Sequence, residues 1–177
     1  MTQLNIEAYN QTDNRFLTGD VALVAAAHPG LSLSYATTSR PQWQEPWTDT
    51  VFPPEVILES PDMACFLAFD DEEPVGQIVV LAGPFHTVQI WDIRVAPRLR
   101  RQKIATALLQ YATDWARQCG FEGMAADVPS VNAGYCRFLT ASGYSLGGVD
   151  YLRYRPLERL LPRSLRSAML TFYYYFR

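Results

Sequence analysis

The feature that most constrains the fold is the stretch from residue 87 to residue 120, which changes from strand-like to helix-like spacing across one short turn. It begins "TVQIWDIRVA" (87–96), rich in the β-branched and aromatic side chains that favour strands. After Pro97 and a basic turn, apolar residues recur at steps of three and four, as in an amphipathic helix. They are Ile104, Ala105, Leu108, Leu109, Ala112, Trp115 and Ala116, and Gly120 follows as a helix-ending glycine. A strand leading directly into such a helix predicts an α/β domain.

The remaining pattern extends this prediction over residues 63–177. An acidic turn at residues 71–73 separates two apolar runs and indicates a β-hairpin. A second helix is expected over 132–143, capped by Asn132 and stopped by Gly143. Strands are predicted at residues 63–70, 74–83, 121–128, 144–156 (with a glycine bend) and 168–177. We therefore expect a mixed, mostly antiparallel sheet flanked by helices, within one domain spanning residues 1–177.

Three segments outside this pattern have local predictions of their own. "TGDVALVAAAHPG" (18–30) is rich in alanine and predicts a helix, with Thr18 or Asp20 as its N-cap. The proline-rich and aromatic residues 38–56 predict an ordered loop that ends in a short helical turn. The basic segment 157–167 is a further candidate helix.

The net charge of −3 conceals a strong asymmetry along the chain. Residues 1–93 contain two basic and thirteen acidic side chains, whereas residues 94–177 contain thirteen basic and five acidic ones, which gives net charges of −11 and +8. One interpretation is that the halves attract each other when they pack. The other is that the protein holds an anionic ligand on its C-terminal half and a cationic one nearer its N-terminal half.

Cysteine and histidine content argues against several classes of protein. Cys65, Cys119 and Cys136 are odd in number and widely spaced, and with His28 and His86 they give no metal-site spacing. This spacing predicts a protein without a metal. Reduced thiols and the lack of a signal-peptide pattern predict a cytoplasmic protein. The longest apolar stretch is too short to cross a membrane, and the negative net charge argues against nucleic-acid binding.

The turn between the strand and the helix is unusually basic. It carries Arg98, Arg100, Arg101 and Lys103, and no acidic residue follows before Asp114. The first N–H groups of a helix lack internal partners and carry partial positive charge, so cations there destabilise an isolated helix. A bound diphosphate would offset that penalty. A nucleotide P-loop is excluded because GxxxxGK[ST] is absent, and a solvated basic turn is the structural alternative.

At this point two motifs resemble those of a known family. "DIRVAPRLRRQKIATALLQYA" resembles the acyl-CoA-binding motif of the Gcn5-related N-acetyltransferases, in which a strand ending D-I-x-V precedes R/Q-x-x-G-x-G/A and a long helix. "VNAGYCRFLTASGY" resembles their N-x-x-A-x-x-F-Y-x-x-x-G-F/Y segment. The two motifs occur in the family's order. The ending "GGVDYLRYRP…LTFYYYFR" is similar to the streptothricin acetyltransferase branch.

The resemblance implies a GNAT acyl-CoA N-acyltransferase fold with acetyl-CoA as cosubstrate and no metal. Strand residues Ile93, Arg94 and Val95 would bind the pantetheine arm and polarise the acetyl carbonyl through the main chain. Asn132 would also bond the pantetheine, beside Tyr135. The turn and the first helical turn would hold the diphosphate, through Arg100, Arg101, Gln102, Lys103, Ile104, Ala105 and Thr106.

Two positions depart from the family pattern. At the position of the loop motif's first glycine this chain has Lys103. A lysine fits there if the backbone stays in the ordinary helical region. The family's proton-donating tyrosine is Leu139, which cannot donate a proton. Tyr135 lies one helical turn earlier and is a candidate replacement, although a tyrosine at helical spacing is more often a packing residue.

The chemistry of amine acetylation requires a proton acceptor, because an alkylammonium must lose a proton before its nitrogen can attack. Asp92 and Asp127 are the candidates, each with a purely structural pairing as the alternative. Trp43, Trp47 and Trp91 are candidates for binding a cationic substrate through their ring faces. For Trp43 and Trp47 the structural alternative is that buried tryptophans hold the proline-rich loop in place.

The sequence thus predicts an acetyl-CoA-dependent N-acetyltransferase that acts on a small cationic amine, by direct attack in a ternary complex. The amine would be streptothricin-like, aminoglycoside-like or polyamine-like. The alternatives are a CoA-binding or ligand-sensing module without catalysis, and an acetyltransferase of protein amino groups. A homodimer is possible, and neither nucleic acid nor membrane is expected as a partner.

Overall fold

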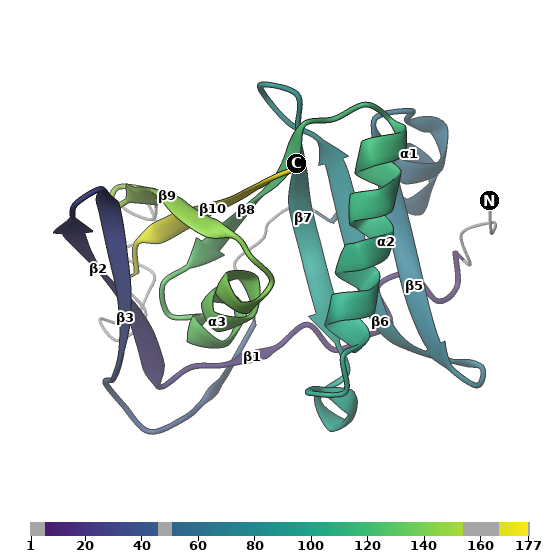
Figure 1. Ribbon diagram of the computed structural model, residues 1–177. Coiled ribbons are helices and arrows are strands. Elements are labelled where there is room, and N and C mark those ends of the chain that lie inside the picture. Colours follow the sequence, from purple (N-terminus) through teal and green to yellow (C-terminus); the bar gives the residue numbers. More distant parts are fainter. Residues whose placement is uncertain (1–5, 46–50, 154–166, 177) are drawn as a thin grey trace. The chain divides into compact units, whose positions relative to one another are not determined.

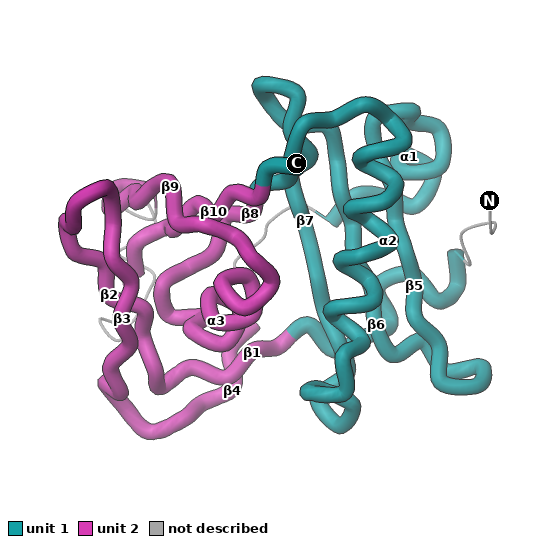
Figure 2. The backbone as a smooth tube through the Cα atoms, viewed as in Figure 1, with its two compact units in different colours: residues 1–14, 46–125, 175–177 teal, residues 15–45, 126–174 magenta. Residues whose placement is uncertain are grey.

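The computed structural model describes residues 6–45, 51–153 and 167–176, and Figure 1 shows their arrangement. Clustering of contacts divides the chain into two compact units: unit 1 comprises residues 1–14, 46–125 and 175–177, and unit 2 comprises residues 15–45 and 126–174 (Figure 2). The elements are, in chain order, β1 (Phe16–Leu17), β2 (Asp20–Ala27), β3 (Gly30–Thr37), β4 (Trp43–Gln44), α1 (Pro54–Glu59), β5 (Met63–Asp70), β6 (Glu73–Ala82), β7 (Thr87–Val95), the short 3₁₀ helix η1 (Pro97–Leu99), α2 (Ile104–Gln118), β8 (Gly123–Pro129), α3 (Ala133–Ala141), β9 (Ser145–Asp150) and β10 (Met169–Tyr175).

The largest sheet has six strands in the order β5-β6-β7-β8-β10-β9. The pairs β5–β6, β6–β7 and β10–β9 are antiparallel, whereas α2 joins β7 to β8 in the manner typical of parallel neighbours. This mixed sheet with its helices confirms the predicted α/β class. In the part of the chain that the structure describes, no helix is both long enough and apolar enough to span a membrane.

Helix α2 packs against one face of unit 1 through the residues that its spacing predicted. Leu108, Leu109, Ala112 and Ala116 are all buried. On β6, Gly76 lets the first turns of α2 approach the sheet, because a Cβ there would lie 3.0 Å from side-chain atoms of Ile104 and of Leu108. Burial of each leucine side chain contributes about 1.5–3 kcal/mol, so this packing fixes where the N-terminal end of α2 lies.

The opposite face of these strands has a second apolar cluster. Successive strand residues point to opposite faces, so Gly76 faces α2 while Val79 faces away from it. Val79 packs there with Tyr9 and Ile57, and Phe52, Met63 and Cys65 surround them. The N-terminal segment and α1 therefore cover the face on which the candidate site lies.

The helix predicted over residues 18–30 is wrong, because this segment forms strand β2 and the turn into β3. The two strands pair in one continuous antiparallel register from Asp20↔Thr37 to Ala27↔Gly30. Gly30 has a φ of +109°, which a tight turn between strands requires and which side-chain-bearing residues disfavour. Backbone pairing with β3 outweighs the local helix propensity of the alanines.

The other local predictions are mostly confirmed. The predicted glycine bend is a β-bulge at Gly147, where an added Cβ would lie 2.5 Å from the Tyr173 ring. The short helical turn after the proline-rich loop is α1. Gly120 follows α2 with a φ of +83°, as a helix-ending glycine does. Residues 157–166 of the basic candidate helix lie outside the described residues.

Candidate active site

A β-bulge in β7 brings two neighbouring side chains to the same face of unit 1. Val79 of β6 pairs with Asp92 and the next residue, Val80, pairs with Ile90, so Trp91 is the additional residue in β7. In a regular strand Trp91 and Asp92 would point to opposite faces. The bulge removes this alternation, and both side chains line one recess.

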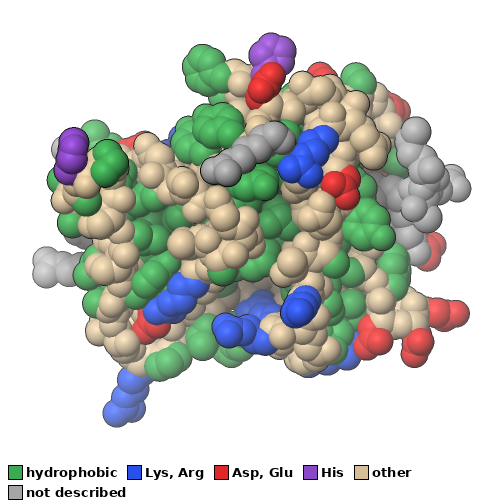
Figure 3. Space-filling model, in the orientation of Figure 1, with side chains coloured by type: hydrophobic (Ala, Val, Ile, Leu, Met, Phe, Trp, Pro, Cys, Tyr) green, Lys and Arg blue, Asp and Glu red, His purple; other side chains and the backbone are tan. Residues whose placement is uncertain are grey.

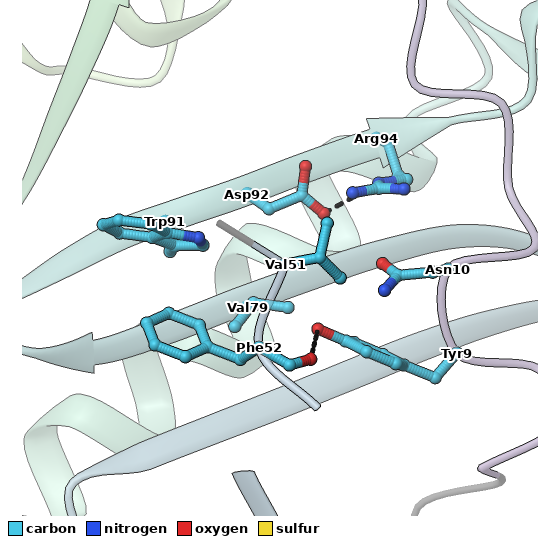
Figure 4. Close-up of a pocket in the computed structure, with 8 residues that line it drawn as sticks. All are labelled: Tyr9, Asn10, Val51, Phe52, Val79, Trp91, Asp92 and Arg94. Carbon is cyan, nitrogen blue, oxygen red and sulfur yellow. Dashed lines mark hydrogen bonds and ion pairs between the residues drawn. The ribbon is translucent and has the colours of Figure 1, made fainter. Parts of the chain in front are cut away.

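That recess lies entirely within unit 1, is partly open to solvent and has room for about one water molecule. Figure 4 shows the Trp91 and Phe52 rings side by side at one end, with their centroids 5.1 Å apart. Tyr9, Asn10, Val51, Phe52, Val79, Trp91, Asp92 and Arg94 line it. Aromatic faces next to a carboxylate can bind a cationic group.

Asp92 is held by two neighbours through one of its oxygens. Its Oδ2 accepts hydrogen bonds from Arg94 Nε at 2.7 Å and from Gln77 Nε2 at 2.8 Å. The structural alternative to a catalytic role, in which Asp92 pairs with a neighbouring group, therefore holds for Oδ2. Figure 4 shows the other carboxylate oxygen pointing away from Arg94. The Asp92 side chain is 18% exposed and that of Arg94 is 10% exposed.

Tyr9, Asn10 and Gln77 belong to this site, although they are not among the residues predicted from the sequence. The Tyr9 hydroxyl donates to the backbone oxygen of Phe52 at 2.9 Å, which fixes one wall of the recess. Asn10 is joined to Gln77, which reaches Asp92. The available signal was the lone polar residue of the apolar run "VGQIVVL" (75–81), because a buried amide needs partners.

Two of the four cations in the basic turn are engaged within unit 1. Arg98 forms ion pairs with Glu73 and Asp70 of the β5–β6 hairpin. Arg100 donates from Nε to the backbone oxygen of Val95 at 2.9 Å, which ties the turn to the end of β7. Arg100 therefore has a structural contact in addition to any role toward a ligand.

Arg101 and Lys103 differ from those two cations. Both are exposed, and neither forms an ion pair with a residue that the structure describes. Helix α2 begins with no side-chain cap and with no acidic residue in its first turn, which Ile104, Ala105 and Thr106 form. Figure 3 shows Lys and Arg side chains gathered around this end of α2. Uncapped N–H groups with nearby cations suit an anion.

The backbone of Lys103 is left-handed, with φ 65° and ψ 9°, and Arg101 has a φ of 67°. The ordinary helical backbone that would accommodate a lysine is therefore not adopted at Lys103. Lys103 instead adopts a left-handed conformation, which glycine adopts freely. A left-handed residue followed by a helical one directs successive N–H groups into a common concavity that binds anions.

Unit 2 carries the second motif on α3. Asn132 is its N-cap, and its Oδ1 accepts from the backbone N–H of Tyr135 at 3.2 Å, as the sequence predicted. Tyr135 is half-buried and stacks on Phe138, with the ring centroids 6.3 Å apart. Leu139 is completely buried, so the residue at the position of the family's tyrosine serves packing.

Asp127 also lies in unit 2, on β8, where its Oδ1 accepts a 2.7 Å hydrogen bond from Thr171 of β10. Trp43 of β4 is half-exposed, and the guanidinium of Arg15 lies 5.9 Å from its ring centroid. Of the predicted substrate-binding tryptophans, Trp91 lines the recess and Trp43 does not, while Trp47 lies outside the described residues. Ile93 and Val95 lie on β7, and Gln102 lies in the exposed turn.

Cys65 lies near Asp92 but is a poor nucleophile. Burial, reinforced by the negative charge of Asp92, raises the pKa of its thiol to about 12. Burial likewise raises the pKa of Cys136 to about 12. Both thiols therefore stay protonated near neutral pH, and a thiolate is the reactive form. Among the described residues, no group of three His, Cys, Asp or Glu side chains is placed to hold a metal ion.

Known proteins resemble this chain both in sequence and in fold. Streptothricin acetyltransferase A of Bacillus subtilis is 25% identical over 154 residues, which cover 87% of this chain and 88% of that protein. Streptothricin acetyltransferase of Escherichia coli is 30% identical over 94 residues, which cover 53% and 54% of the two chains.

Solved structures of acetyltransferases have a similar fold. A candidate streptothricin acetyltransferase from Bacillus anthracis, crystallised with acetyl coenzyme A, superposes with a TM-score of 0.87 at 17% identity over 99% of this chain and 97% of that one. Nourseothricin acetyltransferase superposes with a TM-score of 0.72 at 28% identity over 94% and 90% of the chains. The model of the Acetyltransferase (GNAT) family matches residues 33–144, which is more than half of the sequence. The chain belongs to the GNAT family of N-acetyltransferases.

Proposed function

We propose that this protein transfers the acetyl group of acetyl-CoA to the amine of a small cationic substrate of the streptothricin, aminoglycoside or polyamine type. The observation that carries the proposal is the start of α2, where uncapped N–H groups, a left-handed Lys103 and the cation Arg101 occur together. The streptothricin acetyltransferases to which the chain is similar support this class of amine. Their alignment with most of the chain supports treating both units as one acetyltransferase domain.

The residues at the start of α2 fit a diphosphate. Its negative charge offsets the partial positive charge of the helix N-terminus and the two exposed cations. Backbone N–H groups of residues 102–105 would hold it, with Arg101 and Lys103 beside them. Ile93, Arg94 and Val95 of β7 and Asn132 of α3 would bind the pantetheine arm. When bound, acetyl-CoA supplies the acetyl group as an activated thioester.

The recess beside Trp91 is the proposed binding place for the amine. The second oxygen of Asp92 can accept a hydrogen bond from an ammonium group, and the ring faces of Trp91 and Phe52 favour a cation. The proton that the ammonium must lose then passes to Asp92 or to water, and Asp127 is the competing candidate. Arg94 keeps the Asp92 side chain in place during this step.

The transfer proceeds by direct attack of the amine, because the described residues that line the recess include no cysteine, serine or histidine to carry the acetyl group. The raised pKa of Cys65 keeps its thiol protonated. Leu139 cannot protonate the departing thiolate, and Tyr135 is the one replacement that α3 suggests. A thiolate is also a tolerable leaving group without an acid, since thiols ionise near pH 8.5.

The alternative of a CoA-binding or sensing module is favoured by one observation. Leu139 leaves the family's acid position apolar and buried. Lys103 is the other departure from the motif. Its backbone is left-handed, a conformation open to glycine, so this substitution does not count against cofactor binding. The enzyme and the sensor differ in one measurable result, which is release of the CoA thiol in the presence of an amine.

The experiment measures acetyl-CoA binding by calorimetry and thiol release with streptothricin as the acceptor. Arg101→Gln should weaken acetyl-CoA binding by about tenfold, because a charged hydrogen-bonding partner is replaced by a neutral one. Arg98→Gln is the matched control in the same turn and should leave the affinity within about twofold, since its partners are Glu73 and Asp70. Equal effects of the two changes would show that the turn does not hold the diphosphate. Binding without thiol release would support the sensor.

A further inference from the structure

The most unusual polar side chain in unit 1 is that of Gln77, which is only 1% exposed. It lies on β6 next to the fully buried Ile78, Val79 and Val80. Burying an amide without hydrogen-bond partners is unfavourable, so an apolar residue would serve packing alone better. The contacts of Gln77 explain why this buried position has a glutamine.

Gln77 uses both ends of its amide. Its Oε1 accepts from the backbone N–H of Asn10 at 2.9 Å, and its Nε2 donates to Asn10 Oδ1 at 3.1 Å. The same Nε2 donates to Asp92 Oδ2 at 2.8 Å. One buried side chain therefore connects the N-terminal segment to the carboxylate of the candidate site.

These contacts determine the orientation of the Asp92 carboxylate. Arg94 Nε donates to the same Oδ2 at 2.7 Å. Two donors on one oxygen fix the carboxylate plane, and the second oxygen is left on the side away from Arg94 (Figure 4). Arg94 supplies charge, whereas Gln77 supplies a rigid neutral donor on a strand.

We propose that Gln77 is a positioning residue that orients Asp92. Asn10 holds Gln77 in place, and the N-terminal segment thereby contributes to the acceptor site. This inference rests on the proposed function, in which Asp92 acts on the amine. It assigns residues 9–10 a role beyond covering the sheet. The competing explanation is that Gln77 only satisfies the backbone of Asn10.

The test is a double-mutant cycle with Gln77→Met, Asp92→Asn and the combined variant, measured with acetyl-CoA and streptothricin. Methionine keeps the length of the side chain and removes the amide. If Gln77 acts through Asp92, Gln77→Met lowers kcat/KM for streptothricin by about tenfold or more and leaves KM for acetyl-CoA within about twofold. In the Asp92→Asn background the same change should have little further effect. Independent losses that multiply would overturn the proposal.

Thr113→Val controls for loss of stability. Thr113 is another buried polar residue of unit 1, and it bonds Leu109 and Met124 rather than the site. This variant should lower the melting temperature while kcat/KM stays within about twofold of the wild type. If it lowered kcat/KM as much as Gln77→Met does, the effect of Gln77 would be one of stability and the proposal would fail.

A crystal structure of Gln77→Met separates this proposal from the proposed function. The expected result is an Asp92 side chain that turns away from its wild-type position. If wild type transfers nothing to streptothricin but Asp92 moves in the variant, positioning holds and the proposed substrate is wrong. If transfer occurs and Asp92 stays in place, the acetyltransferase proposal holds and the positioning role is wrong.

Discussion

Lys103 combines a demanding backbone conformation with a position where the family has glycine. L-residues lose roughly 1–2 kcal/mol in the left-handed region, because Cβ crowds the following carbonyl oxygen. Lys103 and Arg101 both adopt it within one turn. Such local strain is maintained where the surrounding structure over-determines it, most often at functional sites.

Replacing Lys103 separates this strain from the charge of the lysine. Lys103→Ala removes the charge and keeps the strain, and Lys103→Gly removes both. We expect the glycine variant to exceed the alanine variant by about 1 kcal/mol in free energy of unfolding, measured by urea denaturation. Acetyl-CoA affinity of the glycine variant should equal or exceed that of the wild type. A large loss of affinity, shared by both variants, would show that the ammonium contacts phosphate directly.

Asp92 and Asp127 compete for the role of proton acceptor, and each is held by a neutral donor, Gln77 or Thr171. Replacing the true base by asparagine should lower kcat by about 10²–10⁴ and remove the acidic limb of the pH–rate profile, because asparagine cannot take a proton. The other variant should keep the wild-type profile. Two unchanged profiles would mean that the amine loses its proton to water.

At this scale the sequence identified Trp91 and Asp92 separately but could not place them together. Alternation along a regular strand puts neighbours on opposite faces. The bulge that unites them depends on the pairing of Val79 and Val80 with β7, a contact between distant parts of the chain. Tyr9 and Asn10 were missed for the same reason, since their role comes from partners 43 and 67 residues away.

Among the elements, α2 and the β2–β3 hairpin show where sequence prediction succeeds and where it fails. The apolar spacing of α2 is long and regular, and the structure buries the same residues. The segment 20–27 has alanines that favour a helix locally, and its strand conformation comes from pairing with residues 30–37. The alternation in "LSLSY" (31–35) was the available signal for a strand partner.

The N-terminus of α3 provides a test at the level of an element, because Asn132 has two predicted roles. Its Oδ1 caps the helix, and its amide group is the predicted pantetheine donor. Asn132→Asp keeps the cap without the donor, whereas Asn132→Ala loses both. The alanine variant should lose about 1 kcal/mol of stability in urea denaturation and the aspartate variant little. Both should raise KM for acetyl-CoA, and an unchanged KM in the aspartate variant would limit Asn132 to capping.

Over the whole molecule, the charge asymmetry between the two halves of the sequence has a partly structural explanation. Among the residues that the structure describes, three basic side chains of the second half form ion pairs with acidic ones of residues 1–93: Arg94 with Asp92, Arg98 with Glu73, and Arg137 with Asp20. The halves therefore do attract each other within the fold. Arg101 and Lys103 take no part in these pairs, so the functional interpretation now depends on the start of α2.

Salt dependence of the reaction distinguishes the two explanations. The Debye length falls from about 30 Å at 0.01 M ionic strength to about 8 Å at 0.15 M, so attraction between an exposed cationic turn and a diphosphate weakens over this range. KM for acetyl-CoA should rise severalfold as NaCl is added. Acetyl-pantetheine carries the same thioester without phosphates, and its KM should change little. Because intramolecular ion pairs are present with either donor, an equal salt effect on both would assign the charge asymmetry to folding rather than to cofactor capture.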